Sequence, residues 1–367
     1  MKDYEKNFSE NLRRLRKSEH LTQKELADLL QYSEKTISKW ECGSCIPDIE
    51  VLFEISKVFK IKIENLFGNS ELYFLGIDGG GTKTELALAD ADGNIIRTHI
   101  TDCCNPIDTG LKESKKILEN AIYEICDDIP FSSISCFAGI AGGTSADMKD
   151  GLKEFFDQFG FRAVDNDSDN KNIITLGLGE NDGSTVVMGT GVCVFVQKNK
   201  KHKKIAGWGY LIDNGGSGYN LGRDALHAYF SAYDKTGAET TLTQEIEKIC
   251  PGGVQIVVGQ IYSGGKKAVA SFAPAVFSAI ENGDALAIEI LEKNINEVVR
   301  FIKVAASEFH LEKIPVVLAG GLTNHEIVVE SIKHALNDDR LEIKKLKKSP
   351  VYGAVDIAFK LAEKDGE

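Results

Sequence analysis

The chain has 367 residues, 43% hydrophobic and 27% charged, which is typical of a folded globular protein with two or three domains. It contains no apolar run long enough to span a bilayer, and its first residues are charged without an apolar core, so we expect no membrane segment and no secretory signal. The formal net charge is −12, but acidic and basic side chains balance over residues 1–68, so any nucleic-acid contact should be confined to that segment.

Residues 1–68 predict five short helices. An amphipathic helix covers 7–18, and Thr22 and Ser33 are placed to cap the second and third helices through their side-chain oxygens. Gly43 ends the third helix, and two further amphipathic helices follow. The tight turn between the second and third helices is typical of a helix-turn-helix domain.

This segment resembles the Xre/Cro family of phage-repressor-type DNA-binding domains. The resemblance rests on Leu21-Thr22-Gln23, Glu25-Leu26-Ala27, Ser33, Thr36-Ile37-Ser38, Trp40-Glu41, Gly43 and Pro47. It implies that the helix from Ser33 enters the major groove of operator DNA, with contacts from Gln23, Ser33, Glu34, Lys35, Thr36 and Lys39. The alternative is that Glu34 and Lys39 are only solvated. Because such heads read two half-sites, we expect a homodimer.

Charge and cysteine patterns add two expectations. Because the segment is neutral overall, its phosphate contacts are expected from the cluster Arg13, Arg14, Arg16 and Lys17. Cys42 and Cys45 form a lone C-x-x-C without a second pair or nearby histidines, so we expect neither zinc nor redox chemistry there. The eight cysteines are scattered, which favours reduced thiols and a cytoplasmic location.

After a hinge at 69–70, FLGIDGGGTKTELALAD predicts a strand, a glycine turn and a second strand. We expect strands at 72–78, 84–89 and 94–100. A P-loop would need a helix directly after its glycines, and a dinucleotide fingerprint would need glycine in place of Thr84. Bare main-chain amides in such a turn can instead cradle a phosphate, while Asp78 can hold a cation. A purely structural turn is the alternative.

The same strand-glycine-strand pattern recurs at Gly189-Thr190-Gly191, between apolar strands at 184–187 and 192–196. A buried strand later ends in Gly320-Gly321 before a helix, and a last helix follows Ser349. The repetition predicts a duplicated, two-lobed α/β fold. Two glycine turns facing each other across a cleft, with a third Gly-Gly near an adenine, would form an ATP site.

These residues resemble the actin-like ATPase and sugar-kinase superfamily, which has a duplicated ribonuclease H-like fold. Within it they resemble the BadF/BadG/BcrA/BcrD ATPase family, which includes N-acetylglucosamine kinase. The resemblance runs from residue 74 to about 362 and rests on the 76–84 and 138–142 segments, Gly189-Thr190-Gly191, the 207–210 and 216–218 segments, Gly222-Arg223, Gly320-Gly321-Leu322 and Gly353-Ala354. With the all-α head at 1–68, it implies a first ATPase lobe over 72–182, completed by a C-terminal helix at 351–367, and a second lobe over 183–350.

The resemblance also implies ATP and Mg²⁺ as cofactors, with Asp78 placing the Mg²⁺. The implied nucleotide contacts are Asp78, Gly79, Gly80, Gly81, Thr82, Lys83, Thr84, Gly189, Thr190, Gly191, Gly320 and Gly321. Asp169, or alternatively Asp167, would be the catalytic base that accepts the proton of the sugar hydroxyl. The implied sugar contacts are Asn105, Asp169, Asn214, Gly216 and Ser217.

Two positions depart from the family pattern. Val192 stands where the second turn usually continues with serine, and Asn214 stands in place of an acid in the 213–218 loop. An amide can bind sugar hydroxyls but is no charged acceptor. The cysteines also lack the glycine-flanked pattern of the iron–sulfur activators that share this fold.

The combined prediction is a DNA-binding regulator with an ATP- and sugar-binding kinase-like domain and no membrane partner. That domain would phosphorylate N-acetylglucosamine or a related amino sugar or hexose. Alternatively, it would be a weak or inactive sensor that gates DNA binding.

Overall fold

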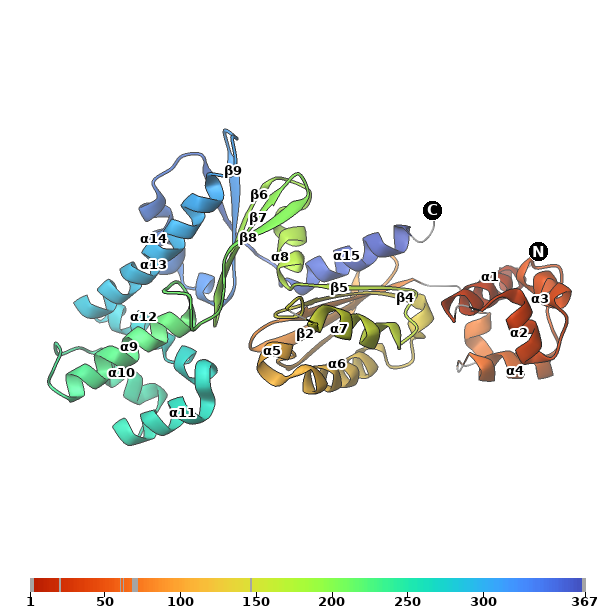
Figure 1. The fold of residues 1–367 in the computed structure, drawn as a ribbon, viewed down its shortest axis with the longest axis horizontal. Coiled ribbons are helices and arrows are strands. Elements are labelled where there is room, and N and C mark those ends of the chain that lie inside the picture. Colours follow the sequence, from red (N-terminus) through yellow and green to blue (C-terminus); the bar gives the residue numbers. More distant parts are fainter. Residues whose placement is uncertain are drawn as a thin grey trace. The chain divides into compact units, whose positions relative to one another are not determined.

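The computed structural model describes residues 3–19, 21–59, 61, 63–67, 72–145 and 147–364 (Figure 1). The chain divides into two compact units, one of residues 1–172 with 350–367 and the other of residues 173–349. This division falls inside helix α8 (Asn170–Gly177), whereas the expected lobe boundary was between 182 and 183. None of the helices within the described ranges has the length and apolar character needed to cross a bilayer.

The described residues of the head form four α-helices and one short 3-10 helix: α1 (Asp3–Ser18), α2 (Gln23–Leu30), α3 (Glu34–Glu41), α4 (Ile49–Val58) and η1 (Ile63–Leu66). The predicted caps are confirmed: Thr22 and Glu25 form a capping box on α2, and the Ser33 hydroxyl accepts from the Thr36 amide at 3.1 Å on α3. The last predicted helix is a 3-10 turn rather than an α-helix. Leu12, Leu26, Ile37, Trp40 and Ile55 belong to the core that these helices enclose.

The first sheet has the strand order β3-β2-β1-β4-β5. Its strands are β1 (Tyr73–Gly79), β2 (Lys83–Ala89), β3 (Ile95–Asp102), β4 (Ile134–Ile140) and β5 (Ala163–Asp167). The three predicted strands are therefore confirmed to within one or two residues at each boundary. β1, β2 and β3 are antiparallel neighbours, whereas β4 runs parallel to β1, and β5 to β4.

Helices cover both faces of this sheet, because successive strand residues point to opposite sides. Leu75, Ile77 and Leu86 face the helices α6 (Leu111–Cys126) and α7 (Met148–Asp157). Phe74 and Ala87 face α15 (Val351–Lys364), the last helix of the chain, which returns to the first sheet (Figure 1). The short elements α5 (Pro106–Thr109) and η2 (Phe131–Ser133) complete this unit.

The second sheet has the order β10-β9-β6-β7-β8, which is the order of the first sheet read from the other edge. Its strands are β6 (Gly183–Met188), β7 (Val192–Lys198), β8 (Lys201–Ala206), β9 (Ile314–Ala319) and β10 (Leu341–Lys345). The first three are antiparallel neighbours and the last two are parallel to β6 and β9 respectively. The predicted duplicated α/β architecture is therefore confirmed.

Helices of the second unit pack on one face of this sheet and form a large hydrophobic core with it, whereas Ile174 of α8 and the adjacent Leu178 contact Val317 on the other face. The helices of the large core are α9 (Gly218–Tyr233), α10 (Leu242–Ile249), α11 (Val254–Ala270), α12 (Ala273–Glu281), α13 (Ala285–Ala306), η3 (Gly321–Asn324) and α14 (Glu326–Leu336). Exposed lysines lie on both edge strands of the sheet, namely Lys201, Lys203 and Lys204 on β8 and Lys344 and Lys345 on β10.

Candidate functional site

In the first unit, three strand ends meet around Asp78. Asp78 lies beside Gly139 of β4, and Gly139 lies beside Asp167 of β5, because the three parallel strands are in register. Sites in α/β proteins form at the carboxyl ends of such strands. The acids expected to bind Mg²⁺ and to act as the base therefore lie along the same edge of one sheet.

The side chain of Asn172 holds Asp78 in place. Asn172 lies on α8, and its Nδ2 donates to Asp78 Oδ1 at 2.7 Å and to the Ile77 carbonyl at 3.3 Å. A Cβ on Gly139 would come within 2.4 Å of the Asn172 amide group, so glycine is required there. Sequence reasoning assigned no role to Asn172, because its contact with Asp78 spans 94 residues and no local signal reports it.

The negative charge of Asp78 is costly in the absence of a cation. Burial raises its pKa to about 7, Asp169 and Glu85 raise it as well, and Asn172 and Lys83 oppose the shift. A carboxylate in such surroundings gains strongly from a bound cation. Across the described residues, no three histidine, cysteine, aspartate or glutamate side chains cluster to hold a metal ion. Nucleotide-bound Mg²⁺ commonly needs only one or two carboxylates beside phosphate and water, so Asp78 fits that role.

The two candidate bases have different neighbours. Asp167 accepts from the Ser168 amide at 2.8 Å, and its Oδ2 lies 3.4 Å from Lys171 Nζ and 3.9 Å from Lys149 Nζ. Asp169 accepts from the Ser168 hydroxyl at 3.1 Å and is close enough to Asp78 to raise the pKa of that carboxyl. Both aspartates therefore remain candidates for the base.

In the other unit, the first residues of α9 hydrogen-bond to the second glycine turn. Within it, the Gly189 amide donates to the Gly191 carbonyl at 2.8 Å. The Gly218 and Tyr219 amides of α9 donate to the carbonyls of Gly189 and Thr190 at 2.8 and 3.1 Å. Because these contacts use the carbonyls of the turn, main-chain hydrogen bonds from α9 help to fix its shape.

The glycines near these turns fall into two groups. At Gly76, Gly79 and Gly320 an added Cβ would come within 2.7 Å of a neighbouring atom, so packing requires glycine there. By contrast, a Cβ would meet nothing within 4 Å at Gly81, Gly189, Gly191 and Gly321, and none of these four has a positive φ. Neither packing nor backbone conformation explains glycine at these four positions. All four positions leave room for a ligand to approach the bare main chain.

Thr84 and Lys83 make contacts of their own beside the first turn. The buried Thr84 hydroxyl donates to the Asp102 carbonyl at 2.7 Å and accepts from the Cys104 amide at 3.1 Å, which joins β2 to the end of β3. Lys83 Nζ is exposed and pairs with Glu85 at 2.9 Å. Thr84 thus has a structural role in the sheet, while the Lys83 ammonium group lies at the surface.

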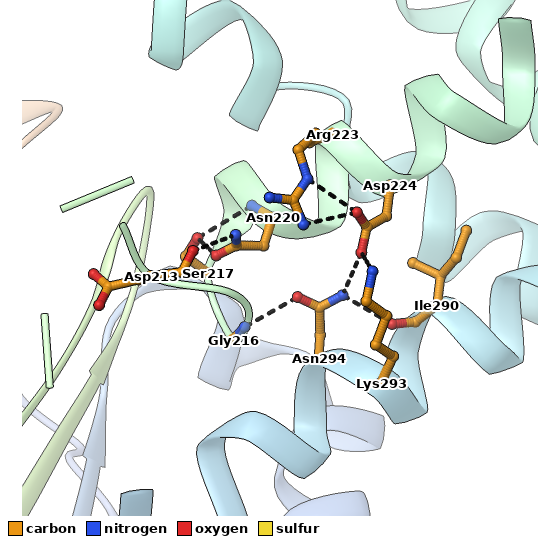
Figure 2. A network of polar contacts seen from close by, with 9 residues as sticks. All are labelled: Asp213, Gly216, Ser217, Asn220, Arg223, Asp224, Ile290, Lys293 and Asn294. Carbon is orange, nitrogen blue, oxygen red and sulfur yellow. Dashed lines mark hydrogen bonds and ion pairs between the residues drawn. The ribbon is translucent and has the colours of Figure 1, made fainter. Parts of the chain in front are cut away.

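The predicted sugar-contact residues differ in exposure. Asn105 is buried and caps α5 by accepting from the Ile107 amide at 3.0 Å, while its Nδ2 donates to Asp108. In the 213–218 loop, the Ser217 hydroxyl caps α9 through the Asn220 amide at 3.1 Å, and the Gly216 amide donates to Asn294 (Figure 2). Asn214 is exposed. Within this loop, the Asn214 side chain is therefore more accessible than the buried Ser217 side chain.

In the head, Glu34, Lys35 and Lys39 are exposed on α3, whereas Ser33 and Thr36 hydrogen-bond to each other at its first turn. Gln23 Nε2 donates to the buried Glu41 at 2.8 Å. Glu41 also pairs with Arg16 at 2.5 Å. Although burial opposes it, hydrogen bonds from Arg16 and Gln23 lower the pKa of Glu41.

Arg16 is less available for phosphate contact than the sequence suggests. Its side chain is only 12% exposed, because it is used in the buried pair with Glu41. A buried carboxylate needs such a partner, which fixes the Arg16 guanidinium inside the head.

Comparisons with known proteins agree with this architecture. A model of the BadF/BadG/BcrA/BcrD ATPase family matches residues 75–358, and a helix-turn-helix model matches residues 12–66. An N-acetylmuramic acid/N-acetylglucosamine kinase of Clostridium acetobutylicum is 28% identical over 301 residues, covering 78% of this chain and 98% of that protein. The HTH-type transcriptional activator BcrR of Enterococcus faecalis is 44% identical over 68 residues, which are 18% of this chain and 33% of BcrR.

Among solved structures, a putative N-acetylglucosamine kinase from Chromobacterium violaceum superposes with a TM-score of 0.68 at 22% identity, covering 79% of this chain and 100% of that one. This likeness confirms the predicted two-lobed actin-like fold. The family match covers both sheets and both glycine turns, and the helix-turn-helix match covers the head. The chain therefore belongs to the BadF/BadG/BcrA/BcrD ATPase family, with a helix-turn-helix domain ahead of the ATPase domain.

Proposed function

We propose that this protein is a transcription regulator that binds DNA through its head and binds ATP and a sugar through its ATPase domain. We further propose that it transfers a phosphoryl group from ATP to a hydroxyl of N-acetylglucosamine or a related amino sugar or hexose. Its similarity to the N-acetylmuramic acid/N-acetylglucosamine kinase supports the substrate class, and its similarity to BcrR supports the regulatory role.

The observation that carries this proposal is the open space beside Gly81, Gly189 and Gly191, combined with the held carboxylate of Asp78. Main-chain amides of the two turns would donate to phosphate oxygens. Asp78 would hold Mg²⁺, which supplies neutralisation of the phosphate charge when bound. Asn172 keeps the Asp78 carboxylate in one orientation, so this carboxylate would lose little further conformational freedom when the cation binds.

Asp169 or Asp167 would accept the proton of the attacking hydroxyl, and Asn105 and Asn214 would contact the sugar. To test this, ADP release would be measured with a panel of hexoses and amino sugars, using the intact chain, Asp169→Asn and Asp167→Asn. We expect sugar-dependent turnover that one of the two substitutions abolishes. Equal rates in all three proteins would contradict a base at either position. An absence of sugar-dependent turnover in the intact chain would contradict the kinase.

A second function, a sensor without catalysis, is favoured by Asn214, which stands where the family has an acid. A thermal-shift screen of nucleotides and sugars, separately and together, tests binding without turnover. A ligand at ~100 times its dissociation constant stabilises the folded protein by about 2.7 kcal/mol. Stabilisation by sugar and nucleotide without ADP release would establish the sensor, and stabilisation by neither would contradict both functions.

DNA recognition is proposed for Gln23, Ser33, Glu34, Lys35, Thr36 and Lys39, in a homodimer that reads two half-sites. Selection of binding sequences from a random DNA library, followed by sedimentation analysis of the complex, would test both points. We expect a site with two repeats and two chains bound. A single half-site bound by one chain would contradict the dimer. Lys39→Ala should weaken binding, with Lys57→Ala on α4 as a charge-matched control.

A further inference from the structure

A network of polar contacts joins the 213–218 loop to α9 and α13 (Figure 2). At its centre is the buried side chain of Asn294 on α13. Asn294 Oδ1 accepts from the Gly216 amide at 3.0 Å, and its Nδ2 donates to Asp224 Oδ2 at 3.3 Å and to the Ile290 carbonyl at 2.9 Å. One side chain thus connects the main chain of the loop to a carboxylate of α9.

The carboxylate of Asp224 is itself held by two cations. It is 9% exposed, and its Oδ1 accepts from Arg223 Nε and Nη2 at 3.0 and 2.9 Å. Lys293 Nζ donates to Oδ2 at 2.9 Å. Because the ionised carboxylate can only accept and the Gly216 amide can only donate, the Asn294 amide has one satisfactory orientation. The network therefore fixes both the position and the orientation of that amide.

The rest of the loop is restrained at both ends. The Asp213 carboxylate accepts from the Trp208 and Gly209 amides at 3.2 and 2.8 Å, and the Asp213 carbonyl accepts from Asn220 Nδ2 at 3.1 Å. At the other end, Ser217 caps α9. Asn214 lies exposed between these restraints. The network thus holds in place the segment that presents the Asn214 side chain.

We propose that Asn294 and Asp224 are positioning residues for sugar binding, and that they act by fixing the loop that presents Asn214. This inference rests on the proposed sugar-binding function. A loop that is ordered before binding does not lose that conformational freedom when the sugar binds. Loss of the Asn294 anchor should therefore weaken sugar binding more than nucleotide binding, because the loop meets the second glycine turn at its far end, where the Gly218 amide donates to the Gly189 carbonyl.

The first test compares Asn294→Ala with Asn296→Ala, a matched substitution at an exposed asparagine of the same helix. Hydrogen–deuterium exchange of peptides covering 213–218 reports loop order directly and needs no ligand. Steady-state kinetics report KM for N-acetylglucosamine and for ATP. For Asn294→Ala we expect faster exchange in the loop and a rise of about tenfold in the sugar KM, with a smaller rise in the ATP KM. Asn296→Ala should match the unaltered chain in all three measurements.

A second test separates positioning from a general loss of packing. Asn294→Asp alone would place a second carboxylate against Asp224, so it should raise loop exchange and the sugar KM at least as much as Asn294→Ala. Adding Asp224→Asn restores one amide and one carboxylate at the contact. The double variant should therefore recover part of the slow exchange and of the low sugar KM.

The proposal is overturned if loop exchange in Asn294→Ala equals that of the unaltered chain. It is also overturned if the ATP KM rises as much as the sugar KM, because that pattern indicates general disruption of the unit. If the unaltered chain shows no sugar turnover, the kinase fails as a function. The sugar dissociation constant from calorimetry then replaces KM, and an unchanged constant in Asn294→Ala overturns the positioning role. If the unaltered chain binds no sugar at all, the positioning role falls together with sugar binding.

Discussion

The two sheets repeat one strand order, yet their glycine turns are chemically different. Asp78 is the last but one residue of β1 that pairs with β2. Val187 has the same position in the second sheet, as the last but one residue of β6 that pairs with β7. The first turn therefore combines main-chain amides with an acid that Asn172 holds, whereas the second turn, Gly189-Thr190-Gly191, contains no acid. The two copies share the strand order, and a carboxylate lies at this position in the first copy but not in the second.

The largest effect is expected from removing that charge. Asp78→Asn should lower Mg²⁺-dependent turnover by on the order of 10²–10³-fold, because the carboxylate that would hold the cation is lost. Asp92→Asn, at the exposed turn at the other end of β2, is the control and should be neutral. ADP release and nucleotide binding with and without Mg²⁺ would be measured. Unchanged Mg²⁺ dependence in Asp78→Asn would remove the distinction between the two turns.

A smaller effect is expected from removing the support of the acid. Asn172→Ala leaves Asp78 in place but deletes the donor 2.7 Å from its Oδ1. The Mg²⁺ concentration for half-maximal nucleotide binding should rise about 10- to 100-fold, as is typical for partners of metal ligands. Thr175→Ala on the same helix serves as the control. A Mg²⁺ titration equal to that of the unaltered chain would show that Asp78 needs no support.

Glycine substitutions sharpen the comparison between ligand-facing and packed positions. Gly81→Ala and Gly189→Ala should change the free energy of unfolding by no more than about 0.5 kcal/mol from that of the unaltered chain, because an added Cβ meets nothing there. Both substitutions should nevertheless weaken nucleotide binding about tenfold. Gly139→Ala should destabilise the protein by about 1–3 kcal/mol, because it collides with Asn172.

Denaturant unfolding and nucleotide titration would measure both quantities for each glycine variant. If Gly189→Ala binds nucleotide as well as the unaltered chain, the second turn does not contact phosphate.

The smallest effect on nucleotide binding is expected from Val192→Ser, which restores the residue usual in the family. Val192 is 4% exposed and lies in the core of the second unit, so the new hydroxyl would be buried there. The free energy of unfolding should fall by about 1–3 kcal/mol, while nucleotide affinity changes little. A marked gain in affinity, measured by calorimetry, would show instead that the hydroxyl reaches the phosphates.

The features that could be predicted from the sequence depend on local chemistry or on repetition. Thr22 and Ser33 cap helices through residues three positions away, and each glycine turn lies between two adjacent strands. The contacts that could not be predicted join distant residues, as Asn172 joins Asp78 and Asn294 joins Gly216. Nothing in a local pattern shows which buried amide will lie next to which carboxylate.

The roles of individual glycines could not be predicted from the sequence for the same reason. Gly79 and Gly81 look alike in the sequence, but only the neighbours brought in by folding distinguish them. The Sγ of Cys104 would lie 2.6 Å from a Cβ on Gly79, whereas Gly81 has open space. The arginines of α1 were equally ambiguous, because the partner that removes Arg16 from the surface is Glu41, on a different helix.

The lysines on β8 and β10 have a consequence for assembly. Lysines lie along both borders of the second sheet, and although Lys203 and Lys344 pair with Glu308 and Glu342, charged side chains at a strand edge discourage two molecules from joining these sheets edge to edge. Any pairing of two heads on an operator would therefore have to come from other surfaces or from the DNA itself.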